Sequence, residues 1–264
     1  MNAVTARPAG GGLRWAVADT LAITGRNLLT QRRLPQLLVF ATIQPVLFVL
    51  MFRYVFGGAI RVPGTSYVDY LMPGIFAQTV VFGSLTTGIG LAEDLGKGLI
   101  ERFRSLPMAR SAVLGGRTLA DLVRNVFVVA LMVTVGFLVG FRVHTSVLGL
   151  LAGLAILLLF GFALSWLFAL IGLHVANAES AQAASFPLMA PLVFASSAFV
   201  PVRSMPGWLQ AFANHQPVSA TIDAVRALVL GGPTLSPVLS SLAWSAGILA
   251  VFAPLAVHRY RRTA

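Results

Sequence analysis

The sequence predicts an all-α integral membrane protein with six transmembrane helices, and three observations support that fold class. Hydrophobic residues make up 57% of the 264-residue chain and charged residues only 10%, against about 45–50% and about 25% in soluble domains. Apolar stretches recur along the whole chain, and each is close to the roughly 20 residues that cross a bilayer core as a helix. Short segments between these stretches hold most of the charge. We therefore expect a single transmembrane domain over residues 1–264.

The chain begins with a polar, glycine-rich segment of residues 1–12, which we expect to be flexible. No short apolar stretch with a small-residue cleavage site follows it, so we expect no removed signal peptide. Residues 13–33 place apolar and charged side chains on opposite faces of a helix, which predicts an amphipathic helix along the membrane interface. Its apolar positions are Leu13, Val17, Leu21, Thr24 and Leu28. This interface helix could anchor the chain before its first span or dock a partner, and the residues leave both roles open.

Stretches without charged residues indicate where the spans lie, because a charge at the centre of a membrane helix costs about 2.5–3.5 kcal/mol on insertion scales. The predicted spans cover residues 34–56, 69–92, 118–141, 147–173, 181–201 and 238–257. An even number of spans places both termini on one side of the membrane. The N-terminal flank, residues 93–124 and the tail would share that side, and together they hold 14 of the 19 basic residues. By the positive-inside rule we expect a multi-pass protein of the cell membrane with both termini in the cytoplasm.

The segment Glu93–Arg117, between the second and third predicted spans, carries eight of the 27 charged residues of the chain. Leu99, Phe103 and Leu106 form an apolar stripe at helical spacing. Pro107 ends this short helix, because the residue before a proline disfavours the helical conformation. Such a helix, with its charged flanks, can transmit the movement of a cytoplasmic partner to the spans. The same pattern fits a solvated amphipathic loop, and the residues alone do not separate the two interpretations.

Residues 202–237 are too long and too amphipathic for a plain loop between the last two spans. Pro206 and Pro217 are each placed to begin a short helix, and Gly231 is placed to end the second one. Asp223 and Arg226 have the spacing of an ion pair within that second helix. We expect this helix pair to pack back on the outer ends of the spans.

The sequence contains no catalytic constellation and no nucleotide-binding or metal-binding motif of its own. The window Gly90–Gly98 resembles a phosphate-binding loop, but five residues separate its first two glycines where four are needed, and Gly98 stands where Ser or Thr is required. The chain has no cysteine, its four histidines are far apart, and no serine belongs to an Asp–His pattern. The net charge of +11 lies in segments that flank the spans, so we expect no nucleic-acid partner.

Acidic residues inside spans would indicate proton or ion coupling. Asp69 is predicted at the outer end of the second span, and Asp121 at the inner end of the third, where it would pair with Arg124. No acid is predicted in the middle of a span, so a proton-driven carrier would lack a relay. Two GxxxG pairs, Gly136–Gly140 and Gly149–Gly153, could each mark a close contact between helices.

Two groups of motifs resemble one protein family. The segment EDLGKG at 93–98 and the run RFRSLP at 102–107 resemble the first cytoplasmic loop of ABC-2 type transporter permeases, closest to the daunorubicin/doxorubicin-resistance exporters. The outer segment supports this resemblance with FVP at 199–201, MPGWL at 205–209, NHQPVS at 214–219 and AVR at 224–226. Both groups fall where the family has them among six spans. His215-Gln216-Pro217 departs from the Asn-Pro-Leu-Thr of many members, which leaves the substrate class open.

The resemblance implies an N-terminal interface helix, a cytoplasmic coupling helix after the second span and an outer re-entrant helix pair before the last span. It also implies a second copy of the chain or a paralogous permease, with each permease docked on a separate ATP-binding subunit that holds ATP and Mg. The permease would then be no enzyme and would need no cofactor. Substrates of the subgroup are amphiphilic drugs or lipids, which ATP-driven movements would carry outward.

Carried over by position, the residues expected to couple the chain to the ATP-binding subunit are Glu93, Gly96, Lys97, Glu101, Arg102, Arg104 and Pro107. Aromatic and amide side chains within spans suit an amphiphilic substrate, although each could instead pack or face lipid. The residues considered for a substrate path are Phe40, Gln44, Phe48, Phe82, Phe186 and Phe194. We therefore predict the permease subunit of an exporter of amphiphilic compounds. The alternatives are a proton-driven multidrug exporter and a non-transporting membrane scaffold for a cytoplasmic enzyme.

Overall fold

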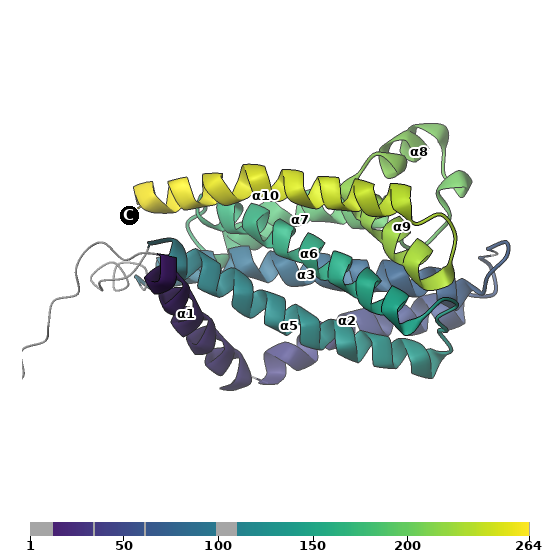
Figure 1. Cartoon of the computed structure of the whole chain (residues 1–264), viewed down its shortest axis with the longest axis horizontal. Helices are drawn as coiled ribbons and strands as arrows, with labels where there is room; N and C mark the ends of the chain where they lie inside the picture. The colour runs from purple at the N-terminus through teal and green to yellow at the C-terminus, as the bar shows by residue number, and fades with distance from the viewer. Residues whose placement is uncertain (1–12, 34, 61, 99–109, 264) are drawn as a thin grey trace, which may run out of the picture.

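Figure 1 shows the computed structural model of the chain, a bundle whose long helices run side by side. The structure describes residues 13–33, 35–60, 62–98 and 110–263, and these contain helices and no β-strand. The elements are α1 (Leu13–Arg33), α2 (Pro35–Leu50), the π-helical turn η1 (Met51–Phe56), α3 (Tyr67–Gly96), α5 (Arg110–Val139), α6 (Val147–Gly172), α7 (Ala178–Phe194), the 3-10 turn η2 (Val202–Ser204), α8 (Gly207–Asn214), α9 (Pro217–Leu230) and α10 (Leu235–Thr263). The predicted all-α fold is confirmed for this part of the chain.

Four helices, α3, α5, α6 and α10, are long and apolar enough to cross a membrane. They correspond to the second, third, fourth and sixth predicted spans, and the structure confirms these as helices of sufficient length and apolar composition. The helix that runs from α2 into η1 has a shorter apolar part, Ala41–Phe56, and α7 has 17 residues. That these two also cross the membrane stays a prediction.

Side-chain caps explain where three of the bundle helices begin. Ser66 Oγ accepts a hydrogen bond from the backbone N–H of Asp69 at 3.1 Å, and Ser146 and Asn177 cap α6 and α7 in the same way. Each cap satisfies one of the four N–H groups that a helix start leaves unpaired. α3 runs on to Gly96, four residues past its predicted span, and α5 starts eight residues before its own. Both ends of the charged segment are therefore helical continuations of spans.

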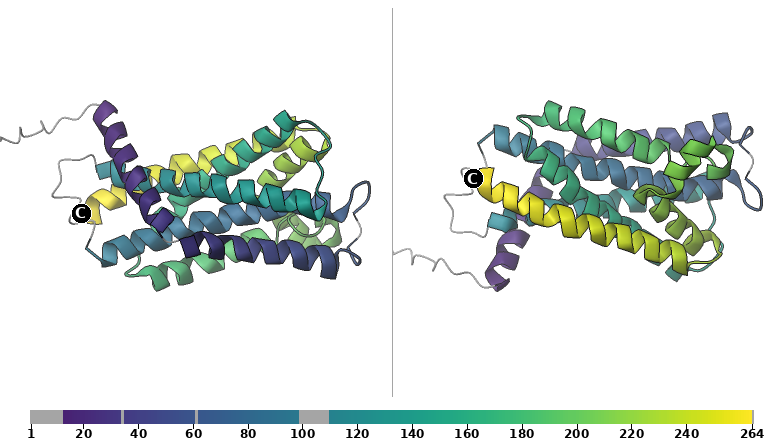
Figure 2. Two further views of the ribbon diagram at one scale, coloured as in Figure 1. Left: turned by 90° about the horizontal axis from the view of Figure 1, so that it is seen from below. Right: turned by 90° about the horizontal axis from the view of Figure 1, so that it is seen from above.

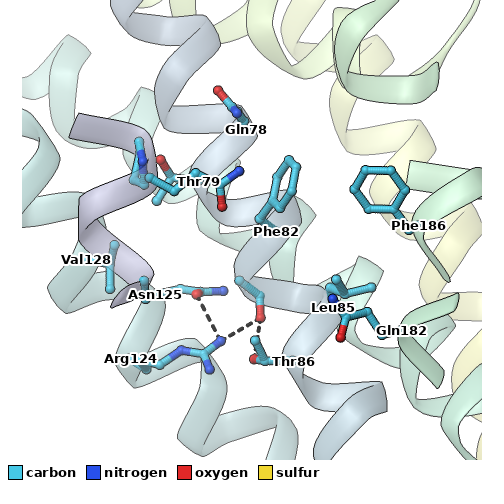
Figure 3. Close-up of a pocket in the computed structure, with 14 residues that line it drawn as sticks. Gln78, Thr79, Phe82, Leu85, Thr86, Arg124, Asn125, Val128, Gln182 and Phe186 are labelled. Atoms are coloured by element: carbon cyan, nitrogen blue, oxygen red, sulfur yellow. Dashed lines mark hydrogen bonds between the residues drawn. The ribbon is translucent and has the colours of Figure 1, made fainter. Parts of the chain in front are cut away.

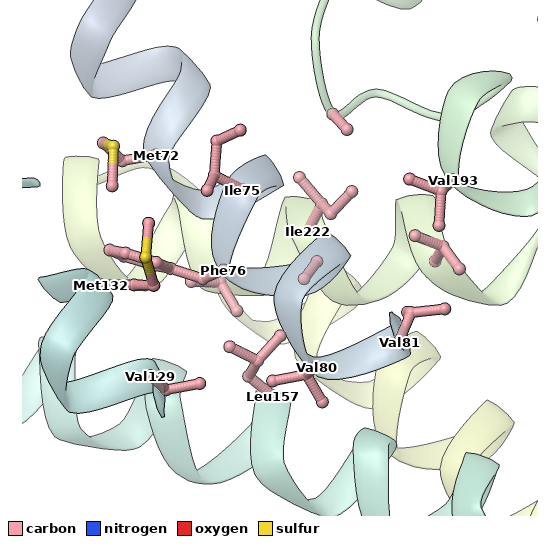
Figure 4. Packing of buried hydrophobic residues seen from close by; sticks show 14 of the residues in the cluster. Met72, Ile75, Phe76, Val80, Val81, Val129, Met132, Leu157, Val193 and Ile222 are labelled. Atoms are coloured by element: carbon pink, nitrogen blue, oxygen red, sulfur yellow. The ribbon is translucent and has the colours of Figure 1, made fainter. Parts of the chain in front are cut away.

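α3 is the central helix of the bundle. Its most apolar stretch is 78% buried, whereas those of α5, α6 and α10 are between 17% and 33% buried. Figure 4 shows the apolar core around this helix. Met72, Ile75, Phe76 and Val80 of α3 pack there with Val129 and Met132 of α5, Leu157 of α6 and Ile222 of α9. The outward faces of α5, α6 and α10 carry exposed apolar side chains, such as Phe127, Leu148 and Leu239. An apolar surface of this kind is unfavourable in water and suits a lipid environment.

The two ends of the bundle are built differently. α1 lies across one end, packed on the start of α5, and α10 ends there too (Figures 1 and 2). α8 and α9 lie at the opposite end. The predicted helix boundaries there are confirmed, since Pro206 precedes α8, Pro217 is the first residue of α9, and Gly231 ends it with a φ of 98°. The predicted pair of Asp223 and Arg226 also forms, with 2.8 Å between Oδ1 and Nη1.

The fifth predicted span, 181–201, ends earlier than expected. α7 stops at Phe194, and residues 195–201 turn toward η2. Two tyrosine hydroxyls of α3 donate hydrogen bonds to carbonyl oxygens in this turn, Tyr70 to Ser197 and Tyr67 to Phe199, both at 3.0 Å. Because these side chains satisfy buried carbonyl groups, the chain can leave the helix inside the protein.

Glycines bring α3 and α6 close together. A Cβ on Gly88 would overlap the backbone carbonyl of Phe168, and a Cβ on Gly172 would overlap that of Gly88. A Cβ on Gly161 would overlap the side chain of Val80. Only residues without a side chain allow two helix backbones to approach this closely.

One of the two GxxxG pairs, left open by the sequence, marks a close contact between helices. Gly149 and Gly153 face α9, where a Cβ on Gly149 would lie 2.5 Å from the carbonyl oxygen of Leu228. Gly136 and Gly140 do not form such a pair, because Gly140 lies just beyond the end of α5 with a φ of 106°. That backbone conformation favours glycine for the turn itself, independently of any helix contact.

We expect Gly88→Ala to destabilise the protein by about 1–3 kcal/mol, since the new methyl group would force α6 away from α3. The matched control is Gly247→Ala in α10, where nothing lies within 4 Å of an added Cβ and alanine favours the helix by up to about 1 kcal/mol. Thermal unfolding of the purified full-length chain in detergent measures both changes. Equal melting temperatures for Gly88→Ala and the unchanged chain would contradict the close contact.

Candidate functional site

A cavity of about 340 Å³ lies inside the bundle between α2, α3, α5 and α7 (Figure 3). Cavities of this size hold small organic ligands. On α3 the cavity extends from Gln78 to Thr86, near the middle of that 30-residue helix. Its polar lining consists of Gln44, Gln78, Thr79, Thr86, Arg124, Asn125 and Gln182. Amide, hydroxyl and cationic groups therefore gather deep inside an otherwise apolar bundle.

Gln78 is the polar residue of the cavity with an unmet hydrogen bond. It is only 2% exposed, and its carbonyl oxygen Oε1 has no hydrogen-bond partner within the described part of the chain. Leaving a buried polar atom unpaired costs about 1–3 kcal/mol. A ligand in the cavity that bonds to this amide would recover that free energy.

Arg124 brings a positive charge to the cavity wall. Its Nη2 donates a hydrogen bond to the Gly83 carbonyl oxygen at 2.5 Å and lies 3.5 Å from Asn125 Oδ1 (Figure 3). Its Nη1 lies 3.4 Å from Asp121 Oδ1, so the ion pair predicted from their spacing is confirmed. Its depth was not expected. Arg124 was predicted at the cytoplasmic end of a span, but it faces Gly83 in the middle of α3.

Asp121 connects three helices on the side of Arg124 away from the cavity. Thr87 of α3 donates a hydrogen bond to its Oδ2 at 2.7 Å, and Gln31 of α1 donates one to its Oδ1 at 3.3 Å. The residue is buried, with 3% of its surface exposed. This carboxylate therefore connects α1 to Arg124 in the wall of the cavity.

Three of the residues considered for a substrate path, Gln44, Phe82 and Phe186, line the cavity. Figure 3 shows the rings of Phe82 and Phe186 close to each other, on α3 and α7. That a substrate passes them stays a prediction. Sequence reasoning missed the amides Gln78, Asn125 and Gln182. Their positions inside apolar segments could have indicated a site, because an amide group costs free energy to bury. The sequence does not indicate, however, which helix faces meet.

Phe48 and Phe194 lie outside the cavity, in an aromatic cluster between α2 and α7. Their ring centroids are 6.2 Å apart, and each is within 6.1 Å of the Phe199 ring. Phe52 stacks on Phe199 at 4.6 Å. Figure 2 shows α2 and α7 side by side along one edge of the bundle, where this cluster holds them together. The side chain of Phe40, the sixth residue considered, lies outside the described residues.

Three of the seven expected coupling residues lie at the end of α3. Glu93 and Lys97 form an exposed ion pair at 2.5 Å, and this hydrogen bond raises the pKa of Lys97, with a further contribution from the charge of Glu93. Gly96 is the last residue of the helix. The other four, and the predicted apolar stripe, lie outside the described residues. These four are Glu101, Arg102, Arg104 and Pro107.

The two ends of the charged segment are joined by one ion pair. Asp94 Oδ2 accepts a hydrogen bond from Arg117 Nη1 at 2.5 Å, which links the last turn of α3 to α5. The Arg117 guanidinium also covers Gly90, where a Cβ would overlap it. Only 22% of the Arg117 side chain and 20% of the Asp94 side chain are exposed. The pair is therefore less screened by water than a surface pair and contributes more to stability.

At the opposite end, Arg226 connects α9 to α3 and to the turn 195–201. Its Nη2 donates hydrogen bonds to the carbonyl oxygens of Ser197 at 2.8 Å and Tyr70 at 3.2 Å. The guanidinium lies over the Tyr70 ring, 3.8 Å from its centroid, in a cation–π contact. Asp223 pairs with the same guanidinium and accepts from Ser197 Oγ. These contacts fasten the helix pair α8–α9 to the central helix.

The described residues contain no cluster of acidic and histidine side chains that could hold a metal ion. His174 and His215 each contact a carbonyl oxygen of their own helix, at 2.8 Å. His144 contacts Asp69 at 3.0 Å. Each of these three histidines thus has a local structural partner.

The sequence matches the ABC-2 type transporter family over residues 18–230. The chain belongs to this family. It is 37% identical to the daunorubicin resistance ABC transporter permease protein DrrB1 of Streptomyces coeruleorubidus over 246 residues, which cover 93% of the chain and 87% of that protein. It is 33% identical to the probable doxorubicin resistance ABC transporter permease protein DrrC of Mycobacterium tuberculosis over 251 residues, or 94% and 90% of the two chains. The putative transport permease ycf38 of Pyropia yezoensis is 30% identical over 225 residues, which cover 80% and 74%.

These matches confirm the resemblance drawn from the two groups of motifs. The relatives are permeases, that is, membrane subunits rather than catalytic ones. The chain is therefore an ABC-2 permease, the membrane subunit of an ABC exporter.

In this ABC-2 permease we expect Asp94→Asn or Arg117→Gln to lower the free energy of unfolding by about 1–2 kcal/mol, because each leaves a half-buried charge without its partner. The reversed pair, Asp94→Arg with Arg117→Asp, should recover part of that loss. Lys97→Gln, which breaks the exposed pair with Glu93, is the control and should change stability by less than about 0.5 kcal/mol. Thermal unfolding compares the variants. A loss as small as that of the control would contradict a structural role for the Asp94–Arg117 pair.

Proposed function

We propose that this ABC-2 permease forms the transmembrane part of an ATP-driven exporter whose ATP is hydrolysed by a separate ABC subunit. The observation that carries the proposal is the Asp94–Arg117 ion pair, because it joins the two helices that the charged segment connects. A protein docked on that segment would move α3 and α5 together. Since the sequence has no phosphate-binding loop, ATP and Mg would be bound by the partner.

We infer six spans, which adds the α2–η1 helix and α7 to the four long helices. α2 has 16 residues and η1 has six, and a helix of that combined length is about 33 Å long, enough for a bilayer core of about 30 Å. The inference is supported by Figure 2, in which both helices run alongside the long ones. With the basic end on the cytoplasmic side of the cell membrane, α1 would lie along the inner interface and α8–α9 would form the outer re-entrant pair.

The proposed docking surface for the ATP-binding subunit is the charged segment. It consists of Glu93, Gly96, Lys97, Glu101, Arg102, Arg104 and Pro107. The exposure of Glu93 and Lys97, with 51% and 62% of their side chains accessible, supports this assignment. α1 offers a second route for movement, because it packs on α5 and reaches Asp121 through Gln31.

A second copy of the chain, or a paralogous permease, would cover the edge formed by α2 and α7. Large apolar side chains are exposed along both helices there. They include Val39, Ile43 and Leu47 on α2 and Leu188 and Phe194 on α7. Both helices contribute to the cavity, so a permease dimer formed through this edge would bring two cavities near its centre.

We propose amphiphilic drugs or lipids as the substrates, bound in the cavity during export. The rings of Phe82 and Phe186 suit the apolar part of such a molecule, and the amides of Gln44 and Gln78 suit its polar part. The names of two relatives connect them with daunorubicin and doxorubicin resistance.

A proton-driven exporter is the less supported alternative, because the buried carboxylates are held by partners. Asp121 pairs with Arg124 and accepts a hydrogen bond from Thr87. Asp69 accepts hydrogen bonds from the backbone N–H of Arg142 and the hydroxyl of Ser66. A scaffold without transport is also less supported, since it would need no polar cavity inside its bundle.

Reversing the charge of the docking surface tests the coupling. We expect Arg102→Glu with Arg104→Glu to abolish ATP-driven export and co-purification of the ATP-binding subunit, because the charge that the partner surface would complement is then reversed. The matched control is Arg261→Glu with Arg262→Glu, which makes the same charge change in the exposed last turn of α10.

Affinity purification from membranes and vanadate-sensitive efflux measure the two effects. If the double variant kept both the partner and the efflux, the docking surface would be wrong. Efflux that needed a proton gradient and no ATP-binding subunit would favour the proton-driven alternative.

The topology can be tested with single cysteines, because the native chain has none. We expect Thr65→Cys and Gly232→Cys to react with a membrane-impermeant maleimide added to intact cells. Gly96→Cys and Arg262→Cys should react only after the cells are opened. Labelling of Gly96→Cys in intact cells would contradict the proposed orientation.

A further inference from the structure

We propose that the cavity selects amphiphiles by charge and takes those with an anionic head group in preference to cationic ones. The inference rests on the proposed export of amphiphilic compounds. What is new is the charge of the head group that the substrate places in the cavity. The residues that carry it are Arg124, Asn125 and Gln78.

The cavity wall carries one positively charged side chain. Among the described residues that line it, Arg124 is the one ionised side chain, and no carboxylate is present. Asp121, which does not line the cavity, pairs with this guanidinium, with 3.4 Å between Asp121 Oδ1 and Arg124 Nη1. A cationic head group would therefore find no counter-ion in the cavity, whereas an anionic one would meet a guanidinium.

The Arg124 guanidinium has donors left for a ligand. It carries five N–H groups, and its contacts with Gly83, Asn125 and Asp121 account for at most three of them. Its planar group can present two parallel N–H donors to a carboxylate or phosphate, which a lysine ammonium cannot do. An acidic head group is thus the ligand that matches the unused donors.

Gln78 Oε1 has no hydrogen-bond partner in the described part of the chain, and as an acceptor it would match a hydroxyl rather than an anionic oxygen. Gln78 lines the cavity from α3 and Arg124 lines it from α5, and Figure 3 shows the two side chains at opposite ends of the cavity, with the Phe82 ring nearer to Gln78. By rotation the Gln78 amide group presents either an N–H donor to an anionic oxygen or a carbonyl acceptor to a hydroxyl. The contact with a hydroxyl would satisfy Oε1, the atom without a partner in the described part of the chain.

The remaining wall is suited to an apolar body. The rings of Phe82 and Phe186 and the side chains of Leu85 and Val128 line the cavity beside the polar groups. A flat aromatic or alkyl portion would pack there while its acidic end faces Arg124. Flat rings are favoured next to phenylalanine because aromatic pairs stack.

The test uses the full-length chain in phosphatidylcholine nanodiscs and three pyrene probes that differ only in head group. These are pyrenebutyric acid, pyrenebutanol and pyrenebutylamine, with empty nanodiscs as the blank. We expect the acid to bind about tenfold more tightly than the amine, with the alcohol between them. Pyrene fluorescence titration gives the three affinities.

Variants then assign the preference to the cavity. Arg124→Gln should weaken binding of the acid by about tenfold and leave the alcohol nearly unchanged, and Arg124→Lys should restore part of the loss. Gln78→Leu leaves the Asp121 pair in place and should weaken acid and alcohol alike by about threefold. The controls are Arg142→Gln and Gln36→Leu, the same changes at exposed positions outside the cavity, which should bind like the native chain.

An amine that binds as tightly as the acid would overturn the inference. So would an acid affinity that neither Arg124→Gln nor Gln78→Leu changes, and Gln78→Leu keeps the test decisive if the arginine variants do not fold. ATP-dependent efflux by the complete transporter tests the proposed function separately. If efflux needs ATP and the probes show no charge preference, only the preference is wrong.

A membrane lipid and a free amphiphile can carry the same acidic head group, and the nanodisc composition separates them. Phosphatidylglycerol added to the discs should lower the affinity of pyrenebutyric acid if anionic lipid occupies the cavity, and this competition should vanish in Arg124→Gln. If a free amphiphile is the ligand, the affinity should not depend on phosphatidylglycerol. Both results support an acidic head group and name its source.

Discussion

The backbone contact between α3 and α6 is the constraint on which the rest of the bundle depends. Gly88 and Gly172 let the two helices approach until their carbonyl groups touch the opposite helix. In lipid, where apolar side chains gain little by leaving the solvent, close packing of this kind is a main source of helix association. The contact fixes α3 at the centre and leaves its other faces to α2, α5 and α7. α6 in turn carries α9 and α10.

The position of α3 explains why the functional groups lie along one helix. Its outer end holds the turn 195–201 through Tyr67 and Tyr70, its middle forms the cavity wall, and its inner end reaches α5 through Asp94. A displacement applied at the charged segment would therefore act on the helix that also contacts the cavity and the outer helix pair. A rigid helix of 30 residues transmits such a displacement over its whole length. The architecture thus provides one continuous mechanical connection between the two ends of the bundle.

The sequence was most informative where short-range rules decide the structure. The four long apolar helices, the helix starts at Pro206 and Pro217 and the pair Asp121–Arg124 all follow from composition, proline chemistry or helical spacing, and the structure confirms them. The cavity could be predicted only in part, because it depends on which faces of four helices meet. α6 and α7 are apolar or small on every side, so their sequences do not indicate which face turns inward. Gln44 and Phe82 were predicted from residue type, but their convergence with Gln182 was not.

Arg124 shows where counting charges for topology reaches its limit. As a basic residue between two apolar windows it was assigned to the cytoplasmic end of a span, and a residue that served only orientation would be best placed there, in contact with water. Its side chain is instead 12% exposed and lies opposite the middle of α3. Moving a cation out of water costs several kcal/mol even after relaxation, and Asp121, Gly83 and Asn125 offset that cost only in part, at 2.5 to 3.5 Å. A role in orienting the chain in the membrane does not explain why Arg124 is buried at this cost in free energy. A role for its charge in the cavity does.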